Sequence, residues 1–150
     1  MIDLLDLDFD VISDEAPIPV DYSAFESVCR YVLLALGQAG IWVVTVALVG
    51  DDALRRLHAE FMDEDSVTDV MTFPAGEPGQ EGGDIVISVD RAAEQGPEHG
   101  FTMDQEVRFL FLHGLLHLCG WNDLSTTDRE RMLAQQTALL ERFDRAGEAS

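Results

Sequence analysis

Two histidines and an aspartate stand at spacings that suit a metal ion: His113, His117 and Asp123. The residues from about 103 to 119 have the pattern of a helix, and a four-residue spacing there places both imidazoles on one face. Gly120 can adopt the left-handed conformation that ends a helix, so Asp123 can return to the same point. Two imidazoles and a carboxylate leave one tetrahedral position open, as in catalytic zinc sites. The spacing therefore predicts one Zn²⁺ per chain, which would lower the pKa of its water to about 7.

The alternative interpretation is that His113 and His117 are core histidines on an amphipathic helix. Gly120 and Asp123, which follow them, favour metal binding. The ligand spacing is also that of the metzincin proteases, so we expect a metzincin-like metal helix. Those proteases carry their general base, a Glu, directly after the first His. Gly114 fills that position here. The sequence therefore favours a metal hydrolase over a peptidase.

Three further segments extend the pattern beyond the histidines. Residues 113–123 read HGLLHLCGWND, residues 68–74 read TDVMTFP after a helix that begins near 51, and residues 83–88 read GDIVIS. In order and spacing these segments resemble the YbeY endoribonucleases, the rRNA maturation factors, over roughly residues 40 to 135. The resemblance implies a zinc-dependent endoribonuclease specific for single-stranded RNA, acting in rRNA 3′-end maturation and ribosome quality control. It implies His113, His117 and Asp123 as catalytic metal ligands, and ribosomal RNA and the small ribosomal subunit or its associated factors as partners.

The chain departs from the family pattern at three positions. Asp123 replaces the third family histidine and remains a competent zinc ligand, although its charge makes the site less electrophilic. Asn122 stands where Asp is usual. Met62 occupies the position of the family Arg, which is suited to bidentate phosphate binding as Met is not. Two alternatives therefore stay open: a non-catalytic ribosome-associated metal-binding protein and, less favoured, a metallopeptidase.

Several other side chains have both a functional and a structural interpretation. Arg55 and Arg56 could replace the phosphate contact that Met62 cannot make, but solvation at the surface is the favoured role for both. His58 could lie near the cleft, but a position on the helix surface is favoured. Glu106 could orient a metal ligand or be a solvated helix carboxylate. Asp69 and Thr72 could contact substrate, and for Asp69 a cap or turn is weighed evenly against that role. Cys119 is expected to pack rather than ligate.

The charge of the chain limits its partners. Nine Arg and no Lys stand against 29 acidic residues, which gives a net charge of −20 over 150 residues. Such a field repels phosphate backbones, so charge-driven binding to nucleic acid, DNA included, is excluded, and any RNA contact must be local. Cys29 and Cys119 form no C-x-x-C motif, the first residues are acidic, and no uncharged run approaches the ~20 residues of a membrane span. We expect a cytoplasmic protein without membrane contact.

The elements that position these residues fit an α+β fold, with residues 1–150 as a single YbeY-like metal-dependent hydrolase domain. We expect a four-stranded mixed sheet with about five helices. In the strand near the N-terminus, apolar residues alternate with Asp, which predicts an edge strand with a solvated face. The second strand is apolar enough to predict burial on both faces. The predicted strands are 2–12, 41–49, 70–73 and 84–88. The predicted helices run from a cap at Asp21 or Ser23 to 37, from 51, over 89–95, over 103–119, and from a cap at Ser125 to about 143.

Overall fold

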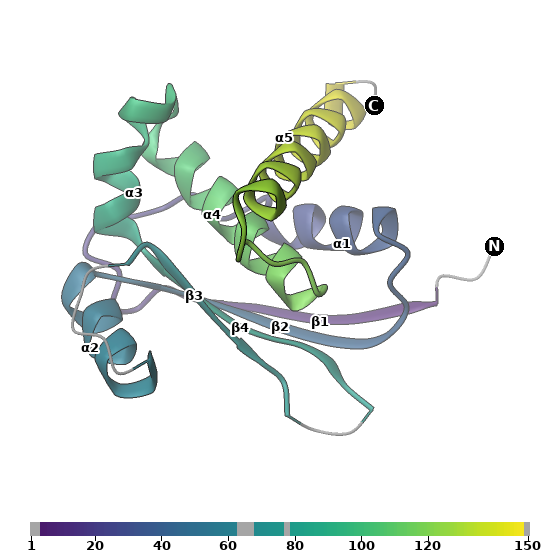
Figure 1. The fold of residues 1–150 in the computed structure, drawn as a ribbon, viewed down its shortest axis with the longest axis horizontal. Coiled ribbons are helices and arrows are strands. Elements are labelled where there is room, and N and C mark those ends of the chain that lie inside the picture. Colours follow the sequence, from purple (N-terminus) through teal and green to yellow (C-terminus); the bar gives the residue numbers. More distant parts are fainter. Residues whose placement is uncertain (1–3, 63–67, 77–78, 149–150) are drawn as a thin grey trace.

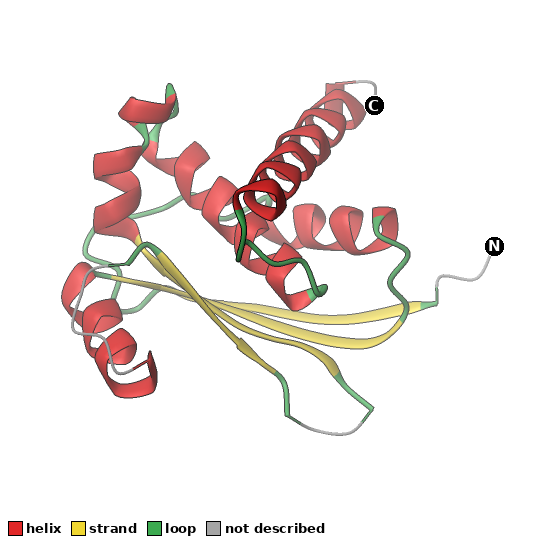
Figure 2. Ribbon diagram, in the orientation of Figure 1, coloured by secondary structure: helices red, strands yellow, loops and turns green. Residues whose placement is uncertain are grey.

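A four-stranded mixed sheet forms the base of the molecule, and most of the helices lie on one face of it (Figures 1 and 2). The computed structural model describes residues 4–62, 68–76 and 79–148. In sheet order β1-β2-β4-β3, the first three strands are parallel and β3 is antiparallel to β4. The strands are β1 (Leu5–Ile12), β2 (Gly40–Val49), β3 (Val70–Pro74) and β4 (Glu81–Ser88). The helices are α1 (Phe25–Ala35), α2 (Asp51–Met62), α3 (Val89–Gln95), the 3₁₀ turn η1 (Pro97–His99), α4 (Met103–Leu118) and α5 (Thr126–Glu148). The expected α+β class with a mixed sheet is confirmed.

Helix α4 is the central element, because it contacts β3 and β4 of the sheet and helices α1, α3 and α5 (Figure 1). Its buried side chains, among them Phe111 and Leu115, meet the inward-facing apolar residues of β2 and β4. Phe111 also stacks on Phe25 of α1, with ring centroids 5.0 Å apart and an interplanar angle of 4°. An aromatic pair of this kind contributes about 0.5–1.5 kcal/mol beyond its burial. The residues that carry the metal-binding pattern are thus fixed to the most buried part of the molecule.

Strand β2 is buried fully on one face only. Its residues alternate between buried and half-buried, with Trp42 and Val44 inside and Val43 and Thr45 half-buried on the other face. Of the helices that the structure describes, α2 lies on that second face, toward one end of the sheet (Figure 1). The expectation of burial on both faces is therefore wrong. The apolar composition of a strand indicates that it forms a strand, but it does not show how much of each face a helix covers.

Several element boundaries also differ from expectation: α1 ends at Ala35 and not at 37, and α5 extends to Glu148, beyond the expected end near 143. Helix α1 begins at Phe25, and its N-cap residue Ala24 makes no side-chain cap, so neither Asp21 nor Ser23 caps it. Instead Asp21 Oδ1 accepts hydrogen bonds from the backbone and hydroxyl of Ser23, closing a turn before the helix. Ser125 does accept from the N–H of Asp128 at the start of α5, as expected. Strand β4 begins at Glu81, three residues before Asp84, inside the segment expected as a loop.

Gly114 lets α4 approach the sheet closely between the two histidines. A Cβ at this position would lie 2.8 Å from Ile85 Cγ2 and 3.1 Å from Thr72 Cγ2. Contacts this short require a neighbour to move, so the absence of a side chain sets the distance of α4 from β3 and β4. The position that carries the catalytic Glu of metzincins therefore faces the sheet in this chain.

Replacing Gly114 with Ala is expected to destabilise the protein. Ala adds roughly 0.5–1 kcal/mol of helix stability, but overpacking against Ile85 costs about 1–3 kcal/mol, so we expect a net loss in urea unfolding. The matched control is Thr137→Ala, at an exposed position of α5, which lacks the clash. A Gly114→Ala protein at least as stable as wild type would show that the helix–sheet contact is loose.

Candidate metal centre

The structure brings His113, His117 and Asp123 together. The two histidines lie one turn apart on α4, and Gly120, with φ +97°, turns the chain after the helix. Their Nε2 atoms are 3.1 Å apart, and Asp123 Oδ2 lies 3.5 Å from His113 Nε2 and 3.6 Å from His117 Nε2. One ligand atom from each residue thus falls within 4.8 Å of the others, and the three residues could hold a metal ion.

Hydrogen bonds on the far side of each ring decide which nitrogen faces the centre. His113 Nδ1 lies 3.0 Å from Gln136 Oε1, and His117 Nδ1 lies 3.0 Å from the carbonyl oxygen of Trp121. Gln136 Nε2 donates to the carbonyl of Phe109 at 3.2 Å, which fixes the orientation of the amide. Both partners are acceptors, so both Nδ1 atoms carry the proton and both Nε2 atoms present lone pairs. Two lone pairs 3.1 Å apart repel each other unless a cation lies between them.

The spacing of the three atoms fits a tetrahedral ion. Zinc–ligand distances of about 2.0–2.1 Å at tetrahedral angles place neighbouring ligand atoms about 3.3 Å apart, against the 3.1, 3.5 and 3.6 Å found here. The donor set of two neutral imidazoles and a carboxylate is one that zinc accepts. The residues therefore fit such an ion without rearrangement of the backbone.

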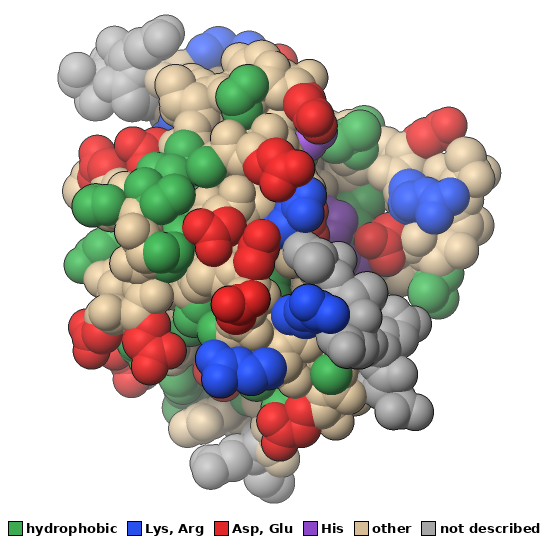
Figure 3. Space-filling model, turned by 90° about the vertical axis from the view of Figure 1, so that its left-hand side faces the viewer, with side chains coloured by type: hydrophobic (Ala, Val, Ile, Leu, Met, Phe, Trp, Pro, Cys, Tyr) green, Lys and Arg blue, Asp and Glu red, His purple; other side chains and the backbone are tan. Residues whose placement is uncertain are grey.

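The centre lies at the wall of a cleft with a volume of about 510 Å³. The cleft is lined by all three residues, by the edge strand β3, and by residues of α2. The ligand side chains remain accessible, with exposed fractions of 26% for His113, 25% for His117 and 40% for Asp123. Figure 3 shows histidine side chains set into a hollow whose rim carries acidic and arginine side chains. Because the three side chains are partly exposed and line the cleft, solvent and a ligand can reach the centre from the cleft.

The structure distinguishes between the other candidate residues. Asp69 and Thr72 line the cleft, and so does His58, which was expected at the helix surface. Arg55 and Arg56 line a separate hollow on α2 and do not line the cleft.

Two residues near the metal helix have structural roles, as far as the structure describes them. Asn122 Oδ1 accepts from the N–H of Leu124, which closes a turn after the metal helix. Cys119 is the C-cap residue of α4 and packs against the core, as expected. The side chain of Met62 lies outside the described part of the chain.

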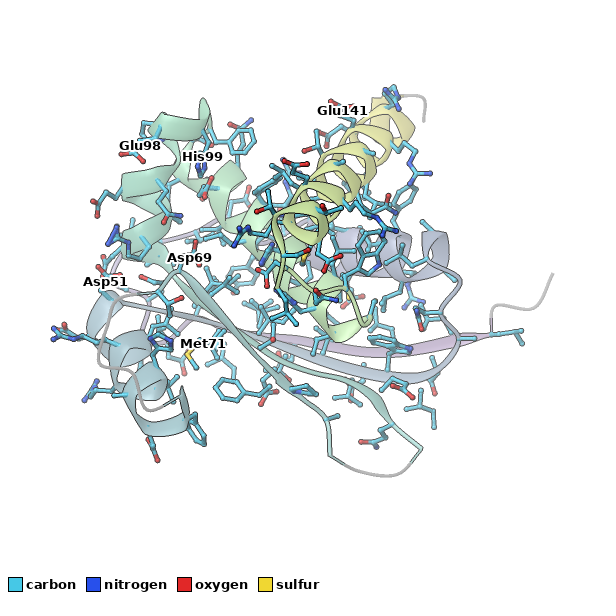
Figure 4. The ribbon with its side chains drawn as sticks, viewed as in Figure 1. Asp51, Asp69, Met71, Glu98, His99 and Glu141 are labelled. Carbon is cyan, nitrogen blue, oxygen red and sulfur yellow. The ribbon has the colours of Figure 1, made fainter. Side chains whose placement is uncertain are left out.

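Glu106 is buried, so the interpretation as a solvated carboxylate is wrong. Its Oε1 lies 2.9 Å from His99 Nδ1, and its Oε2 accepts from Gln95 Nε2 at 3.3 Å. Gln95 Nε2 also donates to Asp69 Oδ2 at 3.3 Å, which links the buried carboxylate to the cleft. Figure 4 shows Asp69 at the start of β3 and His99 above it on the same side of the molecule. The hydrogen bond to Glu106, with nearby carboxylates, raises the pKa of His99 above its ordinary value of 6.5.

Gln136 is the residue that the sequence did not identify. It comes from α5, 23 residues after His113, and is 2% exposed. The signal that could have identified it is a glutamine on the apolar face of an amphipathic helix, because a buried polar side chain needs a hydrogen-bond partner. Without the packing of α5 against α4, nothing in the sequence connects it with His113.

The fold and the centre together define an α+β protein with a three-residue metal-binding group on a central helix, at an open cleft. The family model described as "Endoribonuclease YbeY" matches residues 13–144. A protein from Macrococcus caseolyticus named "Endoribonuclease YbeY" is 35% identical, covering 91% of this chain and 96% of that protein. One of the same name from Nautilia profundicola is 37% identical, covering 67% of this chain and 72% of that protein. The chain belongs to the YbeY endoribonuclease family.

A solved structure shares the fold. The solution structure of TM1509 from Thermotoga maritima aligns with a TM-score of 0.59, covering 91% of this chain and 87% of that one, at 22% identity. At that identity the likeness shows the fold alone. Within the described residues, no helix is long and apolar enough to cross a membrane.

Gln136→Leu is expected to weaken metal binding by about 10–100-fold, because His113 loses the acceptor that fixes its tautomer and ring orientation. The affinity for Zn²⁺ is measured by competition with a chromogenic chelator. Gln135→Leu, at the neighbouring position of α5, is the matched control and should bind as wild type does. Unchanged affinity in Gln136→Leu would contradict an orienting role for this amide.

His99 is expected to make stability depend on pH. Its pKa in the folded protein is raised, so the stabilisation is fully present below its unfolded value near 6.5 and is lost as pH rises through the folded value. The difference in unfolding free energy between wild type and His99→Gln should thus be larger at about pH 5.5 than at about pH 8.5. Equal differences at the two pH values would show that the His99–Glu106 contact does not depend on charge.

Proposed function

We propose that the chain is a zinc-dependent endoribonuclease that cleaves single-stranded RNA in 3′-end maturation and quality control of ribosomal RNA. The observation that carries the proposal is the pair of imidazole lone pairs held beside a carboxylate at an open cleft, in a chain of the YbeY family. Residues 1–150 would act as one hydrolase domain. The implied partners are ribosomal RNA and the small ribosomal subunit or its associated factors, in the cytoplasm.

The residues of the centre have separate tasks in this proposal. His113, His117 and Asp123 hold the ion, and Gln136 and the carbonyl of Trp121 keep both rings in the ligating tautomer. A bound Zn²⁺ supplies a Lewis acid for a phosphodiester oxygen and lowers the pKa of a water molecule to about 7. The exposed side of the three ligands directs the scissile phosphate to the cleft side of α4. The protein thus contributes position and charge, which is most of what phosphodiester cleavage requires.

The charge of the protein determines how RNA can bind. With −20 on the chain, long-range steering of RNA is unfavourable, and attraction is restricted to the immediate surroundings of the ion. We therefore infer that RNA is delivered by the ribosome or a partner. Affinity for free RNA should fall only shallowly with salt, since few phosphates are contacted. A steep salt dependence would contradict this mode of binding.

A peptidase is the weaker alternative because of the packing at Gly114. A side chain at that position would start 2.8 Å from Ile85 Cγ2 and 3.1 Å from Thr72 Cγ2, so the carboxylate that serves metzincins as general base has no room there. The other alternative, a ribosome-associated protein with a non-catalytic metal, is favoured by Met62 and disfavoured by the accessible ligands.

The three functions are separated by one set of assays. Purified protein is incubated with unstructured RNA and with casein, with and without a chelator, beside His117→Ala. We expect RNA cleavage that the chelator abolishes and that falls at least about 100-fold in the variant, because a ligand to the catalytic ion is lost. About one zinc per chain without cleavage would support the non-catalytic alternative, and casein cleavage would support the peptidase.

Metal content tests the ligand set independently of activity. Elemental analysis should give about one zinc per chain in wild type and much less in Asp123→Ala, because a two-ligand site binds zinc weakly. Asn122→Ala is the matched control, since Asn122 is the neighbouring residue and its side-chain oxygen accepts from the N–H of Leu124. Equal zinc in wild type and Asp123→Ala would remove Asp123 from the ligand set.

A further inference from the structure

The apolar face of α2 ends in an aromatic side chain that the core does not cover. Leu54 is fully buried, and the partly buried Leu57 packs against the same apolar cluster. Phe61 follows at the same helical spacing, and 59% of its surface is exposed. An apolar stripe on a helix normally faces the core. Single exposed apolar residues are common, so what distinguishes Phe61 is the place where it lies.

Phe61 lines the cleft that contains the candidate metal centre. The lining residues of this cleft come from both faces of the edge strand β3. Thr72 lies against α4 at Gly114, whereas Met71 and Phe73 belong to the apolar cluster that α2 covers, as the alternation of side chains along a strand requires. Figure 1 shows α4 and α2 on the two faces of the sheet. A flexible polymer that crosses the edge at β3 can therefore contact both the metal centre and Phe61.

The ring of Phe61 is held in place and has an open face. It meets the ring of Phe73 at a centroid distance of 5.3 Å and an interplanar angle of 72°. Such an edge-to-face contact uses the edge of one ring and a face of the other, so Phe73 covers at most one face of Phe61. The cleft volume of about 510 Å³ lies in the range of roughly 300–1,000 Å³ typical of small-molecule sites. The cleft therefore has room for a flat ring stacked on Phe61.

The charged groups of the cleft offer little to a phosphate. Its described lining contains Asp69 and Asp123 and no arginine, and the chain carries a net charge of −20. Apart from the ion, we therefore expect affinity for RNA to come from uncharged contacts. Every base has a π face, and stacking of one base on an aromatic side chain contributes about tenfold in affinity. The bases of a duplex already stack on each other, so this contact favours single strands.

We propose that Phe61 is a stacking platform for one base of a single-stranded RNA, on the α2 side of β3, while a phosphate of the same strand lies at the metal centre. The proposal rests on the proposed endoribonuclease function and adds to it a residue that contacts the substrate. Stacking does not read the hydrogen-bonding edge of a base. The platform therefore accepts any base, and it supplies affinity that the negative charge of the protein does not oppose.

Substrates that lack one base test this contact. Each is a uridine oligomer in which one position in turn carries a ribose without a base, and kcat/KM is measured for wild type and Phe61→Leu. In wild type we expect one position at which loss of the base lowers kcat/KM about tenfold. In Phe61→Leu the same loss should change kcat/KM by less than about twofold, because leucine offers no ring. Each ratio is taken within one protein, so a lower overall rate of the variant does not affect it.

Matched variants assign the effect to the platform. Tyr22 is an aromatic residue with 40% of its surface exposed that does not line the cleft, so the ratio in Tyr22→Leu should equal that of wild type. Phe61→Trp keeps a ring and should keep the sensitivity to the missing base. Thermal unfolding and zinc content confirm that each variant is folded and loaded. No sensitive position in wild type, or an unchanged ratio in Phe61→Leu, would overturn the proposal and leave the endoribonuclease function standing.

Binding separates the two proposals if RNA is not cleaved. In that event the proposed function fails, and the tryptophan fluorescence of Phe61→Trp tests the platform alone. A uridine oligomer should quench Phe61→Trp more strongly than wild type, whose emission comes from Trp42 and Trp121. Tyr22→Trp is the control and should show no added quenching. Equal quenching in Phe61→Trp and Tyr22→Trp, or tighter binding of casein than of the oligomer, overturns the proposal, the latter in favour of a protein partner.

Discussion

The repulsion between two imidazole lone pairs is the interaction on which the site depends. Gln136 and the carbonyl of Trp121 take the Nδ1 protons, which leaves the Nε2 atoms of His113 and His117 facing each other at 3.1 Å. In a folded protein such a contact is unfavourable on its own and becomes favourable when a cation lies between the nitrogens. Asp123, 3.5 and 3.6 Å away, adds charge of the sign that a cation requires. The fold therefore holds three residues that could ligate a metal ion in an arrangement suited to one, which would reduce the reorganisation cost of binding.

This arrangement requires three parts of the fold to meet. Gly114 lets α4 rest directly on β3 and β4, so the histidines lie at the sheet edge instead of above the sheet. Gly120 reverses the chain so that Trp121 and Asp123 return to the helix end. Helix α5 then crosses α4 and supplies Gln136. A change in any one of these contacts moves a ligand or its hydrogen-bond partner, so stability and metal binding are coupled here more closely than in a site built on loops.

The local part of this site could be predicted from the sequence and the long-range part could not. The spacing of His113 and His117 and the glycine after the helix are set by helix geometry, which is local. Gln136 reaches His113 only through the packing of α5 on α4, and the burial of Glu106 depends on where α3 and η1 lie. The prediction of the fold has the same limit. The strands and helices follow from the periodicity of the sequence, whereas the half-exposed face of β2 depends on how far α2 extends.

Asp123, which stands where the family pattern has a third histidine, changes the charge of the candidate metal centre. With the proposed zinc bound, one carboxylate among the ligands would leave a net charge of about +1 at the centre, against about +2 with three neutral imidazoles. In a chain of net charge −20, that smaller charge attracts a phosphate less strongly, and Met62 offers no guanidinium to compensate. Under the proposed function, long-range attraction of RNA is therefore weak, and contacts close to the ion would hold the substrate. The acidic field that weakens long-range attraction of RNA also disfavours other polyanions, so under the proposed function binding would depend on delivery of the substrate to the cleft.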